Sequence, residues 1–198
     1  MKRTSLVAGL GLSLLMACWA CGRQVSTATN PQSNSNQANP TGSGELRFKA
    51  PDAWVTEKTT SSMRMAQYRV PRAEDDKEDA SLVLYFFGAT QGGTAQANID
   101  RWIGQMQQAD GSDSKARAKT ENLTINGLKV STVDVTGTYT AEMAPGSKTF
   151  HNDAEYRLRA AVIETPKGNY FVKLAGPAKT VAHWDQAYND YLKSFEFK

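Results

Sequence analysis

Residues 45–198 are predicted to form a single α+β domain, in which an antiparallel β-sheet of about six strands packs with two main amphipathic helices. Three observations support this prediction. Several short runs alternate apolar and polar side chains or are rich in β-branched and aromatic residues, as β-strands are. Two longer segments repeat their apolar residues at helical spacing. Turn residues join neighbouring strand-like runs directly, which favours antiparallel pairing because parallel strands need long connections.

Three strands are predicted in the first half of the domain. Residues 81–87 (SLVLYFF) give the strongest signal, because a short, continuous apolar run is typical of a central strand covered on both faces. Residues 45–50 alternate more weakly and predict a short strand. Residues 63–70 predict another strand, which ends at Pro71 because proline cannot donate to a strand ladder.

Two hairpins are predicted in the second half. Asn126-Gly127 separates the strand-like runs 116–125 and 128–139, and an Asn-Gly pair in this position is a strong signal for a tight hairpin turn. The second pair of strands covers residues 156–163 and 170–174, on either side of Pro166-Lys167-Gly168. The polar residues 140–153 between the two hairpins are predicted to form a long loop.

Two helices complete the predicted domain. The first covers residues 95–109, with Thr94 as its N-cap and Asp110-Gly111 at its end. The second covers residues 178–192 near the end of the chain. Its apolar stripe contains Val181, Trp184, Tyr188, Tyr191 and Leu192. Each helix is therefore expected to pack its apolar stripe on the sheet.

The start of the chain has the pattern of a bacterial export signal. Lys2 and Arg3 precede an apolar run over residues 6–16. That run is too short for a membrane-spanning helix, which needs about 20 residues. It matches the apolar part of a signal peptide, which has about 7–15 residues. Leu15-Met16-Ala17-Cys18 then resembles the lipobox of bacterial lipoproteins. The resemblance implies a signal peptide over residues 1–17, a diacylglycerol thioether on Cys18 and anchoring by several acyl chains.

Two alternatives to this interpretation of the N-terminus remain open. The first is an ordinary secretory signal followed by a disulfide between Cys18 and Cys21, and the second is cleavage before Cys21. The second site is poorer, because Trp19 is bulky where the lipobox has a small residue. If Cys18 carries the lipid, the protein is exported and anchored to a cell membrane. Trp19, rather than Asp, after the lipidated cysteine favours the outer membrane in a cell that has one.

Residues 18–44 are predicted to be a lipidated tether, and the composition of the chain excludes some partners. Residues 22–44 are mostly polar or small, so they cannot bury enough apolar surface to fold. The chain carries 23 Lys+Arg and 20 Asp+Glu, and removal of Lys2 and Arg3 with the signal leaves it nearly neutral. No nucleic-acid partner is expected, because such a role needs a concentrated basic face. Both cysteines precede the domain, which therefore has no disulfide or cysteine nucleophile.

Two histidines are the first candidates for chemistry. His151 lies in a polar segment with Asn152, Asp153 and Glu155, where an imidazole near carboxylates is able to hold a metal ion or act as a general base. A metal site needs three or four converging ligands, however, and one loop offers too few. A solvated loop residue is therefore favoured for His151, and a surface position is favoured for His183.

Other candidate motifs also favour ordinary structural roles. The acidic run 74–79 (EDDKED) offers oxygen ligands for calcium, but it lacks the spacing of an EF-hand loop and Lys77 interrupts it. Residues 88–94 (GATQGGT) lack both phosphate-loop patterns and predict a glycine-rich connection. Ser112 and Lys115 formally match S-x-x-K but are predicted to form a turn. Core positions, rather than a ligand groove, are predicted for Trp54, Trp102, Trp184, Tyr188 and Tyr191.

The order of the predicted elements resembles the PsbP/Mog1/DcrB-like group of proteins. The matching features are the Pro51 to Trp54 turn, the helical Ile99-Asp100-Arg101-Trp102 segment, Gly137-Thr138-Tyr139, Lys173-Leu174-Ala175-Gly176-Pro177 and Ser194-Phe195. The resemblance covers most of residues 45–198 and implies an αβα-sandwich. The group contains assembly factors, photosystem subunits and Ran-binding proteins, so the resemblance implies non-enzymatic binding and supplies no catalytic residues. A fold by itself does not establish a function.

The sequence thus predicts a membrane-anchored lipoprotein of the bacterial cell envelope. Its domain is expected to be a non-catalytic binding or assembly module for an unidentified envelope protein, with no cofactor and no metal. The alternatives are a small-ligand carrier and a metal-assisted hydrolase that uses His151. A deep apolar cavity would favour the carrier, and a closed polar pocket around His151 would favour the hydrolase. An exposed apolar patch would favour binding of a protein partner.

Overall fold

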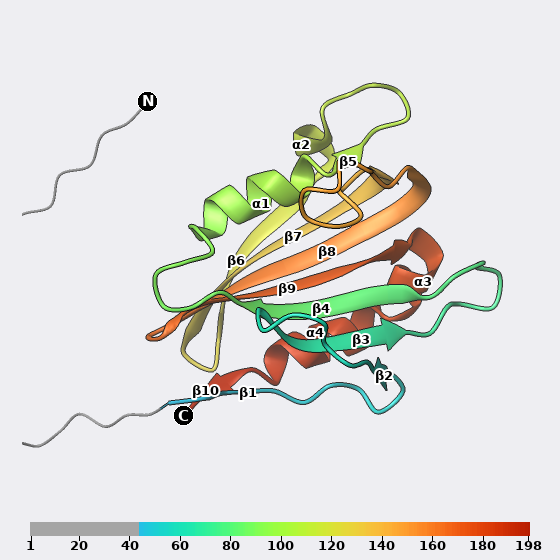
Figure 1. Cartoon of the computed structure of the whole chain (residues 1–198). Coiled ribbons are helices and arrows are strands. Elements are labelled where there is room, and N and C mark those ends of the chain that lie inside the picture. Colours follow the sequence, from blue (N-terminus) through green and yellow to red (C-terminus); the bar gives the residue numbers. More distant parts are fainter. Residues whose placement is uncertain (1–43) are drawn as a thin grey trace, which may run out of the picture. The chain divides into compact units, whose positions relative to one another are not determined.

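The sheet at the centre of the domain contains eight strands, all paired antiparallel. Their order is β2-β3-β4-β9-β8-β7-β5, and β6 also pairs with the outer edge of β7 (Figure 1). The bounds are β2 Val55–Thr56, β3 Arg64–Val70, β4 Ala80–Phe86, β5 Met106–Gln107, β6 Lys119–Ile125, β7 Leu128–Tyr139, β8 Asp153–Thr165 and β9 Gly168–Pro177. This computed structural model describes residues 44–198. The predicted signal peptide, the lipobox and almost all of the predicted tether lie outside the described residues.

Both predicted hairpins are confirmed. Ile125 pairs with Leu128, and the two residues between them, Asn126 and Gly127, have φ angles of 49° and 82°. Positive φ at both positions is the type I′ geometry that matches the twist of the strands. The second hairpin joins β8 and β9 and is longer than predicted. Asp153 pairs with Tyr139, so the strand begins three residues before the predicted position 156.

The first helix is shorter than predicted. α1 covers Ala95–Ile103, and the Thr94 hydroxyl accepts the Ala97 N–H at 3.2 Å, which confirms the predicted N-cap. The helix ends at Gly104 instead of residue 109, because glycine weakens the helix and the next residues form β5 against β7. Met106 is nevertheless 2% exposed, so the apolar periodicity identified a buried residue in a different backbone conformation.

The predicted C-terminal helix is two helices, α3 (Ala178–His183) and α4 (Asp185–Lys193). The break lies at Trp184, whose φ and ψ of −97° and 13° leave the helical region. Its indole Nε1 donates to the Pro71 carbonyl at 2.7 Å, so tertiary packing fixes this residue.

A short helix occupies a segment that was predicted as a turn and the start of a strand. α2 covers Ser114–Arg117, and the Asp113 carboxylate accepts the Lys115 N–H at 2.8 Å as its N-cap. The strand predicted to begin at residue 116 therefore begins at Lys119. Local side-chain capping decides this difference, since Asp113 satisfies a free N–H at the helix start.

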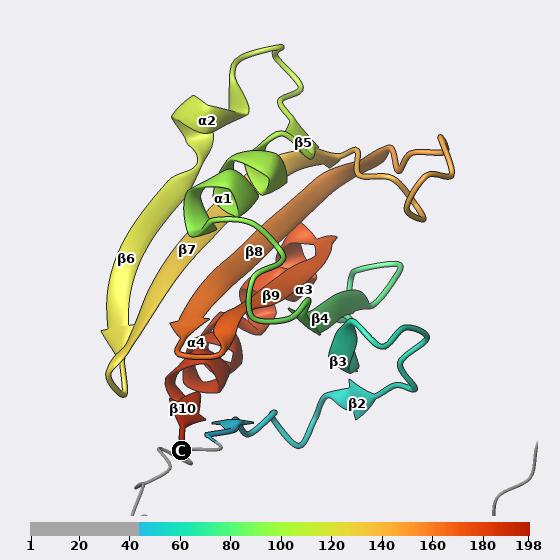
Figure 2. The same ribbon diagram turned by 60° about the vertical axis from the view of Figure 1, so that its left-hand side comes forward.

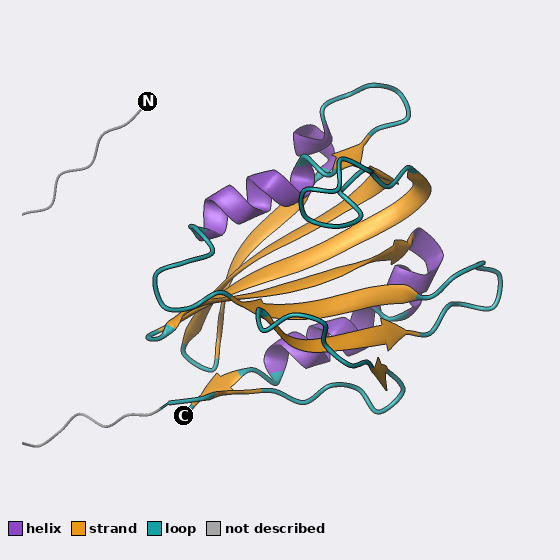
Figure 3. Cartoon of the chain, viewed as in Figure 1, coloured by secondary structure: helices purple, strands orange, loops and turns teal. Residues whose placement is uncertain are grey.

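The helices cover both faces of the sheet, as Figures 2 and 3 show. α3 and α4 pack on one face with β3, β4 and β9, and the buried residues there include Leu82, Val172 and Tyr191. α1 packs on the other face over β7 and β8, against Val133 and Ala160. The predicted α+β sandwich is confirmed. The sheet has more strands than the expected six or so, however, and the helices are small.

The described residues begin and end beside each other. β1 (Leu46–Arg47) pairs with β10 (Glu196–Phe197) in a separate two-stranded sheet (Figure 1). The strand predicted over residues 45–50 is thus only two residues long. Its short length agrees with its weak alternation, since only Leu46 is buried within it.

Candidate functional site

The most unusual polar residue of the domain is Lys173, which lies in the middle of β9. Its cross-strand neighbours are Val83 on β4 and Ala160 on β8, both of them buried. Ala160 belongs to the core under α1, so Lys173 projects from the α1 face of the sheet. A lysine at this position is placed in an apolar sheet surface, where a charged side chain is costly unless it has a partner.

The partners of Lys173 within the domain are neutral. Its Nζ donates to the Gln105 Oε1 at 2.6 Å and to the Tyr139 hydroxyl at 2.8 Å. It also lies 4.9 Å from the centroid of the Tyr139 ring. Gln105 is held just beyond α1, because its carbonyl accepts the backbone N–H of Thr140 at 2.8 Å. The ammonium group is therefore positioned by neutral oxygens and an aromatic ring.

This environment lowers the pKa of Lys173 from 10.5 to about 7. Burial is the main cause, since it disfavours the charged amine, and the nearby Arg101 cation adds repulsion. Near neutral pH the amine is thus divided between its charged and neutral forms. It is able to accept a proton, or to take one up when an anion binds beside it.

Two arginines lie near Tyr85, and one of them, Arg101, also acts on Lys173. The Arg64 Cζ lies 5.6 Å from the Tyr85 ring centroid, and the guanidinium donates to the Gln67 Oε1 at 2.6 Å. Arg101, on α1, donates to the Asn98 Oδ1 at 2.5 Å. Burial raises the pKa of Tyr85, while the charges of Arg64 and Arg101 oppose that rise. Both cations therefore lie within electrostatic reach of the Tyr85 hydroxyl.

Aromatic rings border this group of cations. Tyr85 stacks on Phe87 with centroids 5.9 Å apart, and Tyr139 stacks on Tyr156 at the same distance. Burial raises the pKa of Tyr139 to about 12, and the proximity of Tyr85 adds to the shift. Burial also raises the pKa of Tyr156, with a hydrogen bond to Glu78 as the second cause. These hydroxyls remain protonated near neutral pH, and that of Tyr156 is already hydrogen-bonded to Glu78.

His151 lies at the edge of this site. Its ring is 5.0 Å from that of Tyr139, and its Nδ1 lies 2.7 Å from the Asp153 Oδ2. Across residues 44–198 no group of three or more His, Cys, Asp and Glu side chains is arranged to hold a metal ion. The structure thus pairs His151 with one of its predicted neighbours, and it does not place the imidazole in a metal centre among the described residues. His183 is exposed at the end of α3, which agrees with the predicted surface position.

The acidic run 74–79 supports the start of α3. The Asp76 Oδ2 accepts the backbone N–H of Thr180 at 2.7 Å and its hydroxyl at 2.5 Å. Asp79 accepts from Arg69 at 2.8 Å and from the Arg72 N–H at 2.9 Å, and these bonds lower the pKa of its carboxyl. These two carboxylates are engaged within the fold.

The glycine-rich segment 88–94 is a connection from β4 to α1, as predicted. The amide nitrogen of Asn98 donates to the carbonyls of Gly92 and Thr94, at 2.7 and 2.9 Å. Gly92 has a φ of 90°, and a Cβ there would lie 2.7 Å from the ring of Phe171. Glycine is therefore required at this position by the close approach of the loop to β9.

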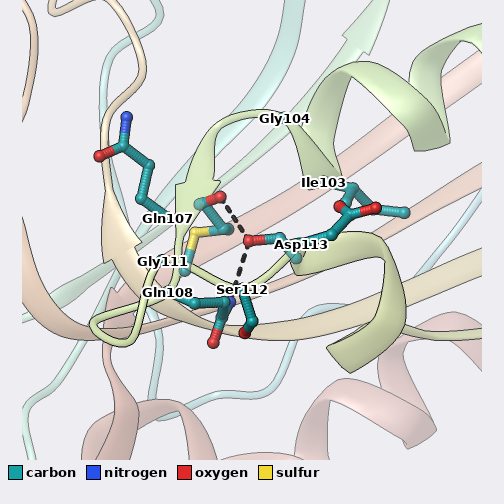
Figure 4. A pocket seen from close by; sticks show the side chains of 9 residues that line it. Ile103, Gly104, Gln107, Gln108, Gly111, Ser112 and Asp113 are labelled. Carbon is teal, nitrogen blue, oxygen red and sulfur yellow. Dashed lines mark hydrogen bonds between the residues drawn. The ribbon is translucent and has the colours of Figure 1, made fainter.

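A hollow of about 360 Å³ lies beyond the end of α1 and includes the predicted Ser112 turn (Figure 4). Ser114 donates its hydroxyl to the Met106 carbonyl at 2.7 Å and accepts from Gln108 at 3.0 Å. Lys115, the other candidate, forms an ion pair with Asp100 at 3.4 Å. Ser112 and Lys115, which the sequence predicts as part of a turn, are not assembled into a nucleophilic site.

The five aromatic residues weighed as groove or core belong to the core. Trp54, Trp102, Tyr188 and Tyr191 are buried. Trp184 is partly buried and packs against the core cluster that contains Tyr188 and Tyr191. Among residues 44–198, the exposed large apolar side chains are Val55, Met63, Met65, Leu123, Met143 and Phe150.

Cys18 and Cys21 lie outside the described residues, so their predicted roles stay predictions. In the described part of the chain, no helix is long and apolar enough to span a membrane.

The sequence did not identify the site around Lys173. In the sequence, Lys173 and Tyr139 belong to motifs that indicate structure alone, and Arg101 belongs to a predicted helix. A signal was present, because Lys173 is the one charged residue of the otherwise apolar run 170–175. That signal gives no partner, since Gln105, Tyr139 and Arg101 come from distant parts of the chain.

No family model matches the chain, and a search of curated proteins found no match. Solved structures do match. LpqN of Mycobacterium tuberculosis, described as involved in cell envelope biogenesis, aligns with a TM-score of 0.53 and 11% identity, over 82% of this chain and 87% of that chain. The domain shares the fold of LpqN. At this identity the similarity shows the fold alone.

Two further solved structures are less similar. A cyanobacterial PsbP from a Synechocystis strain has 13% identity and a TM-score of 0.45, over 85% of this chain and 100% of that chain. A Pseudomonas aeruginosa protein of unknown function, described as a putative regulator, has 13% identity and a TM-score of 0.44, over 71% and 94%. With TM-scores below 0.5, these two structures support no conclusion about the fold or the function of this chain. The α+β sandwich implied by the PsbP/Mog1-like resemblance is nevertheless present in residues 44–198.

Proposed function

We propose that this protein is a lipid-anchored binding domain of the bacterial cell envelope, without catalytic activity of its own. The observation that carries the proposal is the Leu15-Met16-Ala17-Cys18 pattern directly after the apolar run 6–16. Such a pattern leads to export and to acylation of the cysteine, and several acyl chains anchor a protein stably. The polar residues 22–44 then connect the anchor to the domain.

The fold supports the same environment. LpqN, which has this fold, is described as involved in cell envelope biogenesis. A binding role is supported by the site around Lys173, which presents cations and aromatic hydroxyls on one face of the sheet. Rigid strands position these groups, and a preorganised polar cluster beside apolar rings is typical of ligand sites.

The small-ligand carrier is the second candidate, since the Lys173 site is partly buried and combines polar with aromatic groups. The hydrolase has less support. His151 has one carboxylate partner, Asp153, and an acid–base pair of this kind also occurs in ordinary surface loops.

Lipidation is tested by metabolic labelling of the bacterium with a palmitate analogue, followed by separation of the membranes. Wild-type protein is expected to carry the label and to sediment with membranes, whereas Cys18→Ala is expected to lose both properties. Cys21→Ala is the matched control and is expected to keep them. Labelling that survives Cys18→Ala but not Cys21→Ala would move the anchor to Cys21, and a soluble, unlabelled wild type would refute the anchor.

The binding role is tested by mild crosslinking of the anchored protein in intact cells. A stoichiometric envelope partner is expected from the wild type, and its recovery is expected to fall with Cys18→Ala, because the domain then leaves the membrane. Equal recovery from the unanchored variant would contradict a function that depends on the membrane. Absence of any partner would favour the small-ligand carrier.

A further inference from the structure

We propose that Lys173, Arg101 and Arg64 bind the phosphate group of an envelope component, while the rings of Tyr85 and Tyr139 contact the rest of that ligand. The inference deepens the proposed function, since it names the ligand chemistry of the binding domain. It needs neither lipidation nor a protein partner, so the two proposals fail independently.

The first argument is charge balance. The structure contains ten ion pairs among residues 44–198, and none of them involves Lys173, Arg101 or Arg64. The hydrogen-bond acceptors of these cations are side-chain amides and a phenol: Asn98, Gln67, Gln105 and Tyr139. Lys173 and Arg64 are partly buried, whereas Arg101 is exposed. Partly buried cations without a carboxylate partner favour an external anion.

The opposite face of the sheet provides a contrast. Arg157 donates to Asp134 at 2.6 Å and to Asp185 at 3.0 Å, and Arg159 donates to Asp185 at 2.8 Å. These arginines lie under α4 and are fully paired by two aspartates. The fold thus compensates these two arginines with carboxylates, whereas Lys173, Arg101 and Arg64 have neutral acceptors.

The second argument is the direction of the donors. Lys173 comes from β9, Arg101 from α1 and Arg64 from β3. The charges of Arg64 and Arg101 both act on Tyr85, and the charge of Arg101 also acts on Lys173, so Arg101 lies between the other two cations. A phosphate presents oxygens in several directions, whereas a carboxylate presents two in one plane. Convergent arginine and lysine donors on separate elements therefore suit a phosphate, with charge-assisted hydrogen bonds from each.

The third argument comes from the apolar surroundings. Tyr85 and Phe87 are stacked, and Phe87 lies 5.4 Å from Phe171, so the cations border an aromatic surface. A free phosphate would gain little from these rings. A phosphate attached to an apolar body would contact both parts of the site, as ligands of half-apolar pockets do. A phospholipid head group with its adjoining chain has this chemistry.

Binding of a phosphate is expected to depend on pH. An anion near Lys173 favours its ammonium form, so binding takes up a proton above neutral pH and weakens as the pH rises. The other groups that face the site are Arg101 and Arg64, the phenols Tyr85, Tyr139 and Tyr156, and the rim groups His151, Asp153, Glu78 and Glu57. Glu57 accepts a hydrogen bond from Gln67, the partner of Arg64. The phenols are protonated in this range. The rim carboxylates of Asp153 and Glu78 act on Tyr139 and Tyr156.

The test uses the mature protein as isolated from the cell, with or without lipid, in a neutral detergent. Isothermal titration calorimetry measures its binding of three probes: dihexanoyl phosphatidic acid, inorganic phosphate and hexanoate. Saturable binding of phosphatidic acid is expected, with a weaker affinity at pH 9 than at pH 7. Lys173→Met is expected to weaken it about tenfold or more, which is the effect of one charge-assisted hydrogen bond. Lys129→Met, which removes an exposed strand lysine from β7, is expected to change it less than about twofold.

Every outcome decides the proposal. Equal affinity for inorganic phosphate would support the site and identify a free phosphate as its ligand. Hexanoate binding as tightly as phosphatidic acid would overturn the phosphate assignment, and so would unchanged affinity in a folded Lys173→Met variant. If that variant fails to fold, acylation of the wild-type lysines at pH 7 is measured by peptide mass spectrometry. Protection of Lys173 by phosphatidic acid would then support the site, and equal acylation with and without it would refute it.

Discussion

The lowered pKa of Lys173 makes the stability of the domain depend on pH in a specific direction. The folded protein releases the proton of this amine near pH 7, whereas the unfolded chain keeps it until about pH 10.5. Between these values the unfolded state binds more protons, so stability rises with pH. Below pH 7 both states are protonated, and this contribution no longer changes.

The magnitude follows from linkage. A full difference of one proton changes the free energy of unfolding by about 1.4 kcal/mol per pH unit. From pH 7 to pH 9 the folded amine passes from half to fully neutral, which gives an upper value of about 2 kcal/mol. Because Lys173 is not completely buried, solvent screening reduces the expected gain to about 1 kcal/mol. The tyrosines do not interfere, since the unfolded phenols ionise only near pH 10.

The assay is urea unfolding at pH 7, 8 and 9, in the same buffer and at constant ionic strength. The wild type and the control Lys129→Met are expected to gain stability over this range, whereas Lys173→Met is expected to lose that gain. Equal pH dependence in all three proteins would refute the reasoning. A gain of stability on going from pH 7 to pH 5 that is specific to the wild type would also contradict it.

Three further substitutions test other parts of the fold by the same unfolding measurement. Asp76→Ala is expected to cost about 1–2 kcal/mol, because it removes the cap of Thr180 at α3, while the exposed Asp75→Ala should change stability little. Asp134→Ala is expected to cost about 1–3 kcal/mol, since it leaves Asp185 as the only carboxylate partner of Arg157 and Arg159. Asp110→Ala, at a solvent-exposed position, serves as the comparison. Equal losses of stability in the two variants would count against the ion-pair network. Gly127→Ala is expected to cost about 1 kcal/mol, because φ there is 82°, and an unchanged midpoint would contradict the I′ turn.

The accuracy of the sequence-based predictions followed the range of the interactions involved. The β6–β7 hairpin was predicted because Asn126-Gly127 specifies its own turn geometry. The N-cap at Thr94 was predicted for the same reason, since its hydroxyl bonds to a residue three positions away. The predicted end of α1 was wrong, because residues 106–107 pair with β7 instead of continuing the helix.

The same distinction separates the candidate residues. His151 was found from its neighbours in the chain, and the structure does pair it with Asp153. Asp76 was seen only as one charge of an acidic run, since its partner Thr180 is 104 positions away. Lys173 was likewise seen without its surroundings. No local pattern connects it to Gln105, which is 68 positions distant, or to Tyr139, which is 34 positions distant.

The sequence by itself determined the α+β class, the hairpins, the apolar stripes of the helices and the lipobox pattern at Cys18. Each depends on the order of side chains along a short segment, where chain geometry fixes which residues face the same side. The tertiary structure alone decided the extent of the sheet, the break at Trp184 and the neutral surroundings of Lys173. These features arise from contacts between distant segments, and burial changes the chemistry of a lysine only after the sheet has formed around it.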